Sequence, residues 1–561
     1  MTPDRPGTPP SPTTPPTVAR WIGTVLARDA GVKTVFGVVG SGNFHLTNAL
    51  TDHGARFVPA RHEGGAAVMA DAYARVSGEL GVLTVHQGPG LTNALTGLAE
   101  AAKSRTPLLV LAAEATQPTS NFHVDQAGLA AAIGVLPDRV TAASTVANDL
   151  RRAYRTALVE RRTVLLSLPL DVQAQPHPDV PLPPVQVWPR LSPAPETVIQ
   201  VADALARARR PVFIAGRGAR KAKAELTVLS ERVGALLATS AVSRGLFNGA
   251  AFNLDVSGGF ATPAAAELIS GADLVIAWGC ALSMWTTRHG TLIGADATVI
   301  QVDANPGALG VHHRVDLGIP SDVGTAARAL VLELDRRGQR AEGYRTPTVA
   351  RRLAAEGRWR DVPFHAAAEA GRIDPRTLTI ALDDLLPAQR TVATDSGNFM
   401  GYPAMFLGVP DEHGFVFTQA FQSVGLGLAS ALGAAIARPD RLTVAALGDG
   451  GALMGASELE TAVRLGLNDL LVVVYDDEAY GAEVHHFGPH GDSLDHVRFP
   501  PTDLAAIARG HGYAAATVRT EEDLAPVRSW LAEGRDRPML VDAKVTRGRP
   551  SWWLEEAFKG H

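Results

Sequence analysis

The sequence predicts an α/β protein of three doubly wound domains with parallel sheets. Short apolar runs recur along the chain and alternate with alanine-rich stretches of helical period, a pattern typical of βαβ units. The 561 residues are too many for one hydrophobic core. A proline-rich break at 175–195 and an arginine-rich break at 336–372 divide them. We therefore expect domains at 17–180, 190–340 and 370–548, with a disordered tail at 1–16 and a C-terminal tail at 549–561.

The strand candidates are short apolar runs that occur in all three expected domains. They are Gly81–Val85, Leu108–Ala112, Thr163–Leu168, Val212–Ala215, Leu274–Ala277, Val299–Val302, Thr391–Thr394, Leu442–Leu447, Leu470–Val474 and Met539–Val541.

Composition excludes several classes of protein. Hydrophobic residues make up 46% and charged residues 19%, which is ordinary for a globular protein and excludes disorder for most of the chain. The net charge of −5 provides no basic surface for nucleic acid. A single cysteine, Cys280, cannot form an intrachain disulfide, and no apolar run is long enough to span a bilayer. We expect a cytoplasmic protein that binds neither nucleic acid nor membrane.

A glycine-rich turn follows the apolar run Leu442–Leu447. It reads Gly448-Asp449-Gly450-Gly451 and leads into a helical stretch. Glycines at the carboxyl end of a parallel strand let the backbone approach a phosphate. An aspartate there offers a hard oxygen ligand to magnesium or calcium. Any tight turn can contain Gly-Asp-Gly, so this motif alone decides nothing.

A second acidic turn ends the next strong apolar run. Residues 451–475 separate Gly450 from Asp476-Asp477, and acidic side chains at the ends of neighbouring parallel strands can chelate one cation. The two motifs together resemble the cofactor-binding motif of thiamine diphosphate (ThDP) enzymes, which have Asn-Asn in place of the two aspartates. An extra negative charge beside a diphosphate is costly unless the metal offsets it. The Mg²⁺ ligands that the resemblance implies are Asp449, Asp477 and the carbonyl of Ala479.

An independent match lies in the first third, where Arg61-His62-Glu63-Gly64-Gly65 starts an alanine-rich helix. Acids are favoured in the first turn of a helix by its dipole, so Glu63 also has a purely structural interpretation. ThDP enzymes place a glutamate at this helix start. It bonds to the aminopyrimidine ring and promotes the tautomer that takes the thiazolium proton. The resemblance implies this catalytic role for Glu63.

A third match concerns the substrate. Gly88-Pro89-Gly90 resembles a loop of the acetolactate synthase family, but His86 stands where benzoylformate decarboxylases have a proton-transferring histidine. Histidine titrates near neutral pH and suits that task. Ser41, in Gly40-Ser41-Gly42, falls where those decarboxylases have a substrate-binding loop. The alternatives are a hydrogen-bonded structural histidine and a serine that caps a turn.

Further roles in the last third follow by resemblance. Val424 stands where the family bends the cofactor into a V shape, usually with a larger apolar side chain, and the Gln422 carbonyl would hold the aminopyrimidine. Glu483 stands where pyruvate decarboxylases have a catalytic glutamate, although it could also be an exposed helix acid. The other cofactor-binding residues implied are Asp395, Gly397, Asn398, Gly448, Asp449, Gly450 and Gly451.

The middle third carries a weaker signal. Gly216-Arg217-Gly218 follows the strand candidate Val212–Ala215 and hints at a dinucleotide loop, but a lone Gly-x-Gly is weak evidence. Some members of the superfamily bind FAD in this domain and others bind nothing. FAD stays an alternative that we do not favour.

The resemblance covers about residues 18–553. It implies a pyrimidine-binding, a middle and a diphosphate-binding domain, in a homodimer or homotetramer with shared active sites. The expected reaction is ThDP- and Mg²⁺-dependent decarboxylation of a 2-oxo acid with ligation to an acceptor aldehyde or ketone, as in acetolactate synthases. A lysine expected from those synthases is not evident at 133–137. The alternatives are a non-ligating 2-oxo acid decarboxylase, supported by His86, Ser41 and Glu483, and a catalytically silent ThDP-binding homologue.

Overall fold

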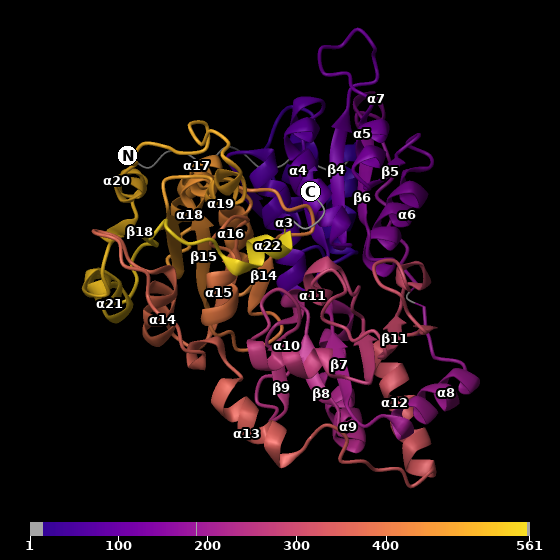
Figure 1. Cartoon of the computed structure of the whole chain (residues 1–561). Helices are drawn as coiled ribbons and strands as arrows, with labels where there is room; N and C mark the ends of the chain where they lie inside the picture. Colours follow the sequence, from indigo (N-terminus) through magenta and orange to yellow (C-terminus); the bar gives the residue numbers. More distant parts are fainter. Residues whose placement is uncertain (1–14, 187, 558–561) are drawn as a thin grey trace. The chain divides into compact units, whose positions relative to one another are not determined.

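A computed structural model describes residues 15–186 and 188–557 (Figure 1), so the tail expected at 1–16 falls almost entirely outside the described residues. Within the described ranges the chain forms two compact units, residues 15–74 with 78–186 and residues 75–77 with 188–557. The first unit contains one sheet and the second contains two. Across these residues each sheet has six strands, all parallel, which confirms the predicted fold class. No helix in the described ranges is long and apolar enough to cross a membrane.

The sheet of the first unit has the strand order β2-β1-β3-β4-β6-β5. The strands are β1 (Thr34–Gly37), β2 (Arg56–Pro59), β3 (Gly81–Val85), β4 (Leu108–Glu114), β5 (Leu136–Arg139) and β6 (Thr163–Pro169). The helices are α1 (Val18–Arg28), α2 (Phe44–Asp52), α3 (Glu63–Ser77), α4 (Pro89–Lys103), α5 (Gln126–Ala132), α6 (Val146–Val159) and α7 (Leu170–Gln173). Leu109 and Leu166 of the sheet share a core with Trp21 and Leu26 of α1.

The middle sheet has the order β12-β11-β10-β7-β8-β9. Its strands are β7 (Pro211–Ala215), β8 (Leu236–Thr239), β9 (Asn253–Val256), β10 (Leu274–Trp278), β11 (Thr298–Asp303) and β12 (Leu317–Pro320). Its helices are α8 (Pro195–Arg207), α9 (Lys223–Val233), α10 (Pro263–Ser270), α11 (Met284–Thr287), α12 (Val323–Arg336) and α13 (Pro347–Glu356). Phe213 packs into a core with α8, α9 and α12, whereas its neighbour Val212 packs into another with α10 and α13. Successive side chains thus serve opposite faces of a doubly covered sheet.

The third sheet has the order β14-β13-β15-β16-β18-β17. Its strands are β13 (Arg390–Thr394), β14 (Phe415–Phe417), β15 (Leu442–Gly448), β16 (Leu470–Asp476), β17 (Ala514–Val518) and β18 (Met539–Lys544). Its helices are α14 (Pro375–Leu385), α15 (Gly401–Phe406), α16 (Gly427–Ala437), α17 (Asp449–Met454), α18 (Glu458–Arg464), α19 (Gly481–Phe487), α20 (Leu504–Gly510), α21 (Ala525–Ala532) and α22 (Trp552–Ala557).

The segment expected to form a C-terminal tail contains α22. Its Trp553 is buried, and its ring packs edge-on against Tyr402 of α15 with 4.9 Å between the centroids. The same tryptophan also packs against Phe260 of the middle domain. This part of the C-terminal segment therefore belongs to the core of the second unit.

All the strand candidates are strands, and each lies inside a sheet. They correspond to β3, β4, β6, β7, β10, β11, β13, β15, β16 and β18. The analysis missed β1, β8 and the strands at the sheet edges, which are β2, β5, β9, β12, β14 and β17. An edge strand such as β5, whose sequence is Leu-Pro-Asp-Arg, pairs on one side only and need not be apolar throughout.

Candidate active site

The candidate residues lie where the first and third sheets reverse their strand order. The chain passes from β1 to β2 on one side and then to β3 on the other, and from β13 to β14 and then to β15 in the same way. In parallel α/β sheets, ligands bind outside the carboxyl ends of strands at such a switch point. Ser41 and His86 follow β1 and β3, whereas Asp395 and Asp449 follow β13 and β15.

Asn43 shapes the loop after β1. Its buried side chain accepts a hydrogen bond from the Gly40 N–H at 2.8 Å and donates to the Val38 carbonyl at 3.1 Å and the Thr84 hydroxyl at 3.2 Å. These bonds tie the loop to β3 and leave Ser41 on its exposed side. The loop is thus held rigidly beside the end of β3.

Glu63 is the first residue of α3 and is half-buried. The Nδ1 atom of His62 caps this helix by accepting the Gly64 N–H at 3.0 Å. The Asn93 amide, from α4, donates to Glu63 Oε2 at 3.0 Å. The cap and the amide fix the carboxylate in position, with one oxygen engaged by Asn93.

His86 lies beside Glu63. A Cβ atom placed on Gly90 would be 3.1 Å from His86 Cβ and 3.6 Å from Glu63 Oε1, so both residues flank this glycine. Burial lowers the pKa of His86, and the charge of Glu63 partly opposes that shift. The His86 Nδ1 atom accepts the Gly42 N–H at 3.2 Å, and the Phe122 ring meets the imidazole edge-on at 5.2 Å between centroids. The structure therefore brings Glu63, His86 and the loop of Ser41 together.

Asp395 is the most enclosed acid at the switch point of the third sheet. Its fully buried carboxylate accepts backbone N–H groups from Ser396 at 2.8 Å, Gly425 at 3.0 Å and Leu426 at 3.3 Å. Burial raises its pKa to about 6 although these donors oppose the shift. Asp395 thus anchors the segment that contains Val424. A Cβ on Gly451 would lie 2.4 Å from Asp395 Oδ2, so the turn after β15 needs glycine there.

Asp449 begins α17 directly after β15, and Asp477 begins the loop after β16, which is the neighbouring strand. Burial raises the pKa of Asp449 to about 8, with added effects from the charges of Asp477 and Asp476. Burial and the charge of Asp476 raise the pKa of Asp477 to about 7. Both carboxylates therefore need a nearby positive charge to be fully ionised at neutral pH.

These residues fit a divalent cation in one arrangement. Within residues 15–186 and 188–557, no group of three or more His, Cys, Asp or Glu side chains could hold a metal ion. Two carboxylates alone would leave a cation with too few ligands, so a site here would need further oxygen ligands such as a backbone carbonyl. The set predicted from Asp449, Asp477 and Ala479 is of this kind, and oxygen ligands are what Mg²⁺ prefers.

Asp476 faces a different partner from Asp477. Its buried carboxylate pairs with the ammonium of Lys544, the last residue of β18, and accepts the Glu478 N–H at 3.0 Å. Lys544 also lies 3.1 Å from Asp542 and donates to the Thr502 carbonyl at 3.0 Å. A buried lysine thus offsets the extra negative charge of the Asp476-Asp477 pair, and the sequence analysis missed it.

The remaining predicted cofactor residues surround the same turn. Gln422 has a left-handed backbone with φ of 62°, a costly conformation for this residue type. Val424 is 37% exposed, and its Cγ1 atom would lie 3.3 Å from a Cβ atom placed on Gly451. Asn398 and Asp477 both lie close to Gly481. A Cβ atom placed on Gly481 would lie 3.3 Å from Asn398 Cβ and 2.2 Å from Asp477 Oδ2. Gly397, with φ of 144°, and Gly448 both lie against the ring of Phe399.

Glu483 lies on α19, which follows the Asp477 loop directly. Its side chain is half-buried, and its backbone N–H bonds to the Tyr480 carbonyl at 3.1 Å. The neighbouring His485 is also half-buried, and burial lowers its pKa. The structure places Glu483 one helical turn beyond the Asp477 loop, and its catalytic role stays a prediction.

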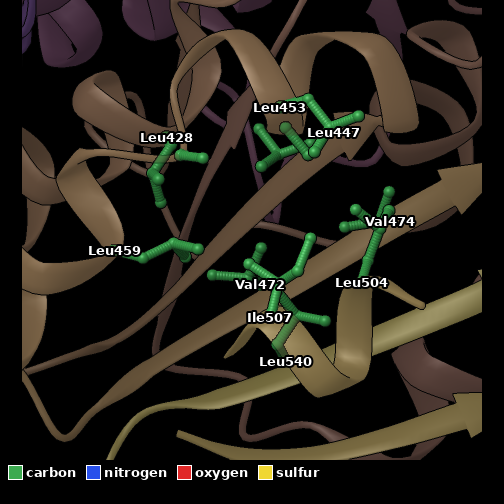
Figure 2. Close-up of a pocket in the computed structure, with 11 residues that line it drawn as sticks. Leu428, Leu447, Leu453, Leu459, Val472, Val474, Leu504, Ile507 and Leu540 are labelled. Atoms are coloured by element: carbon green, nitrogen blue, oxygen red, sulfur yellow. The ribbon is translucent and has the colours of Figure 1, made fainter. Parts of the chain in front are cut away.

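An apolar hollow in the third domain lies apart from this chemistry. Figure 2 shows aliphatic side chains around it, including Leu447, Val472, Leu504 and Leu540 from the sheet and α20, and Leu453 from α17. These side chains provide no polar group to orient a substrate. We interpret the hollow as a packing gap beneath the helix that begins with Asp449.

The switch point of the middle sheet is closed by backbone. The Gly216 N–H donates to the Trp278 carbonyl at 2.9 Å, and the Gly218 N–H donates to the Gly279 carbonyl at 3.1 Å. A Cβ on Gly216 would lie 2.3 Å from the Gly279 oxygen. The two glycines of the Gly-x-Gly motif therefore have a packing role that requires no dinucleotide.

Comparisons with known proteins identify the family of this chain. Family models of thiamine pyrophosphate enzymes match residues 16–132 (N-terminal TPP binding domain), 198–330 (central domain) and 395–543 (C-terminal TPP binding domain). A probable 2-ketoarginine decarboxylase of Pseudomonas aeruginosa is 31% identical over 527 residues, covering 91% of this chain and 90% of that protein. The chain belongs to the thiamine pyrophosphate enzymes.

Other relatives of this thiamine pyrophosphate enzyme differ in their named reactions. A sulfoacetaldehyde acetyltransferase of Rhodobacter capsulatus is 29% identical over 556 residues, with 92% of each chain covered. A catabolic acetolactate synthase of Raoultella terrigena is 28% identical over 536 residues, again with 92% of each chain covered. The three relatives are named as a transferase, a synthase and a decarboxylase, and their sequence identities to this chain are similar. Their names therefore select no single reaction, because a shared fold does not determine the substrate.

Three residues of this thiamine pyrophosphate enzyme escaped the sequence analysis. In the sequence, Asn93 is simply a polar residue four positions after Pro89. The one signal that could have found it is this spacing, which places it in the first turns of α4. Phe122 lies in an irregular loop, where no periodicity marks it. Lys544 ends a strand in which it is buried, which is unusual for lysine and indicates a charged partner.

Proposed function

We propose that this enzyme decarboxylates a 2-oxo acid in a ThDP- and Mg²⁺-dependent reaction and joins the remaining acyl group to a second carbonyl compound. The observation that carries the proposal is the set of ionisable side chains at the switch points of the first and third sheets. One holds Glu63 beside an amide donor and a histidine, and the other holds Asp395, Asp449 and Asp477. Ligation is supported by the acetolactate synthase name of one relative, and transfer of an acyl group by the acetyltransferase name of another.

The residues at the third sheet suit the diphosphate end of the cofactor. Asp449, Asp477 and the Ala479 carbonyl would hold Mg²⁺, whose charge meets the need shown by the raised pKa values of both carboxyls. Gly450 and Gly451 let the backbone approach closely, since a Cβ on Gly450 would lie 2.6 Å from the Tyr480 ring. When bound, ThDP supplies a thiazolium ring that accepts the electron pair released as CO2 leaves.

The residues of the first unit suit proton transfer and substrate binding. Asn93 engages Glu63 Oε2, so Oε1 is the atom that would exchange a proton with the aminopyrimidine. His86 and the Ser41 loop would hold the 2-oxo acid. We also propose a homodimer or homotetramer with active sites shared between subunits.

A non-ligating decarboxylase is the second candidate. It is favoured by the place of His86, which lies next to Glu63 and could serve an intermediate that needs protonation and no second carbonyl compound. The 2-ketoarginine decarboxylase name of one relative agrees with this alternative.

The deciding experiment combines the purified protein with ThDP, Mg²⁺ and a panel of 2-oxo acids, with and without acceptor aldehydes and ketones. CO2 release is recorded, and products are identified by mass spectrometry. A coupled hydroxyketone or 2-hydroxy-2-alkyl-3-oxo acid supports the proposal. Free aldehyde alone selects the decarboxylase. No CO2 from any acid, despite bound ThDP, would refute both and leave the catalytically silent homologue.

A further inference from the structure

The imidazole of His86 is held by neighbours that distinguish its two nitrogens. The Gly42 N–H points at Nδ1 at 3.2 Å. A nitrogen that accepts a hydrogen bond has a free lone pair and no proton. A neutral His86 in this position therefore carries its proton on Nε2, and the backbone of the loop after β1 sets that tautomer.

The surroundings of His86 resist a second proton. An imidazolium would direct an N–H from Nδ1 at the N–H of Gly42, so two donors would face each other and one hydrogen bond would be lost. The Phe122 ring meets the imidazole edge-on from another side. Gly40 also lies against the ring, because its Cβ would be 2.7 Å from His86 Nδ1.

Among residues 15–186 and 188–557, the charged group that acts on His86 is Glu63, from the start of α3. The loop after β1 contributes Gly40, Ser41, Gly42 and Asn43, and α4 contributes Gly90. Attraction to Glu63 favours the imidazolium, whereas burial and the Gly42 bond oppose it. Burial is the larger effect, since the net shift lowers the pKa of His86.

We propose that His86 works as a neutral hydrogen-bond donor from Nε2 to an oxygen of the 2-oxo acid, and that the Gly42 N–H is the group that keeps it in this state. His86 then orients the acid and stabilises negative charge on its oxygen, without carrying a proton through the reaction. This inference rests on the proposed function for the identity of the substrate. It replaces the proton-transferring role expected from the sequence.

Three substitutions of His86 distinguish a hydrogen-bond donor from a group that carries a proton through the reaction. The Nε2 of a glutamine amide reaches close to the place of the imidazole Nε2, whereas an asparagine amide reaches only the place of Nδ1. We expect His86→Gln to keep kcat/KM for the best 2-oxo acid within about 10-fold of wild type. His86→Asn and His86→Ala should lose about 10- to 100-fold, the worth of a hydrogen bond to a charged oxygen. His45→Gln, on the exposed face of α2, is the matched control.

The pH profile gives a readout that a structural role would not produce. The kcat/KM profile of His86→Gln from pH 5.5 to 8.5 should have the same shape as that of wild type. If His86 carries a proton, His86→Gln will be as impaired as His86→Ala, and one limb of the profile will disappear. Either result would overturn the proposal.

A measurement without turnover separates this inference from the proposed function. Solid-state ¹⁵N NMR of the sedimented holoenzyme with ¹⁵N-labelled histidine, minus the spectrum of His86→Gln, isolates the two ring nitrogens of His86. We expect one protonated and one unprotonated nitrogen at pH 6.5 and at pH 8. Two protonated nitrogens at pH 6.5 would refute the neutral donor even if 2-oxo acids are decarboxylated. If no 2-oxo acid is decarboxylated but the neutral tautomer is seen, the proposed function fails and the state of His86 still stands.

Discussion

The switch points of the first and third sheets have one topology and different ionisable side chains. Counted within each domain, β2-β1-β3-β4-β6-β5 and β14-β13-β15-β16-β18-β17 are the same strand order. At the first, Glu63 is half-buried beside an amide donor and a histidine whose pKa is lowered. At the third, Asp395, Asp449 and Asp477 all have raised pKa values.

The difference between the two switch points teaches that the loops, and not the sheet, set the chemistry. The same strand order delivers three loops to one edge in each domain. In the first domain the loops enclose a group that can exchange a proton. In the third they enclose negative charge that a cation would stabilise. Five experiments test this contrast, and we order them from the largest expected effect to the smallest.

Glu63→Gln should nearly abolish turnover and leave ThDP binding almost intact. The amide keeps the size of the side chain and the place of the Asn93 contact but cannot accept a proton. Loss of a general acid–base group costs about 10²- to 10⁴-fold. Single-turnover kinetics with the best 2-oxo acid and fluorescence titration of ThDP measure the two effects. A fully active variant would remove Glu63 from the centre of the mechanism.

Asp449→Ala should reverse that pattern by weakening metal-dependent ThDP binding. Removing a residue that only hydrogen-bonds to a metal ligand already costs about 10- to 100-fold in metal affinity. Loss of a direct ligand should therefore cost at least about 100-fold. Titration of ThDP at fixed Mg²⁺ measures the loss. Asp440→Asn, on an exposed acid of the same domain, is the control. An unchanged titration would contradict the metal site.

Lys544→Met should destabilise the third domain by about 3–5 kcal/mol, because it leaves Asp476 buried without its partner. Asp476→Asn in the same chain removes one of the two carboxyls left without Lys544, the other being Asp542, so the double variant should recover part of the stability. Urea unfolding of the single and double variants forms the cycle. Equal losses in both variants would mean that Lys544 acts through packing and does not offset Asp476.

The stability that Asp395 contributes should fall as pH rises. Its folded pKa of about 6 lies above the unfolded value of 3.8, so its contribution is complete below about pH 4 and is lost as pH rises through 6. Compared with Asp395→Asn, wild type should lose at most about 3 kcal/mol of unfolding free energy between pH 4.5 and 7.5. Urea unfolding of both proteins without ThDP gives the difference. If the unfolding free energy of wild type instead rises relative to that of Asp395→Asn as pH rises, the three backbone donors outweigh burial.

Asn93→Ala should have the smallest effect. It removes one hydrogen bond to a carboxylate, which is worth about 1.5–3 kcal/mol, so we expect a fall in kcat of about 10- to 100-fold. Asn93→Asp should cost more, because a second carboxylate would face Glu63. Steady-state kinetics of both variants measure this order. If Asn93→Ala has full activity, the helix cap at His62 suffices to position Glu63.

By itself the sequence determined the fold class, the ThDP motifs and most of the interior strands, although β1 and β8 were missed. Interior parallel strands are apolar on both faces, so β4 or β16 is visible as a continuous apolar run. Asp449 and Glu63 belong to short motifs at strand and helix boundaries, where residue type follows local geometry. The edge strands were missed because pairing on one side and partial exposure allow proline and charge, as in β5.

Only the tertiary structure decided which side chains meet. Asn93 reaches Glu63 across 30 positions of sequence, and Lys544 reaches Asp476 across 68, distances over which no local pattern extends. The tertiary structure also assigned a packing role to the Gly216-Gly218 motif and set the hydrogen bond from Gly42 to His86. Local motifs record what one strand end or helix start requires. Charge compensation and tautomer choice depend on neighbours that folding brings from elsewhere in the chain.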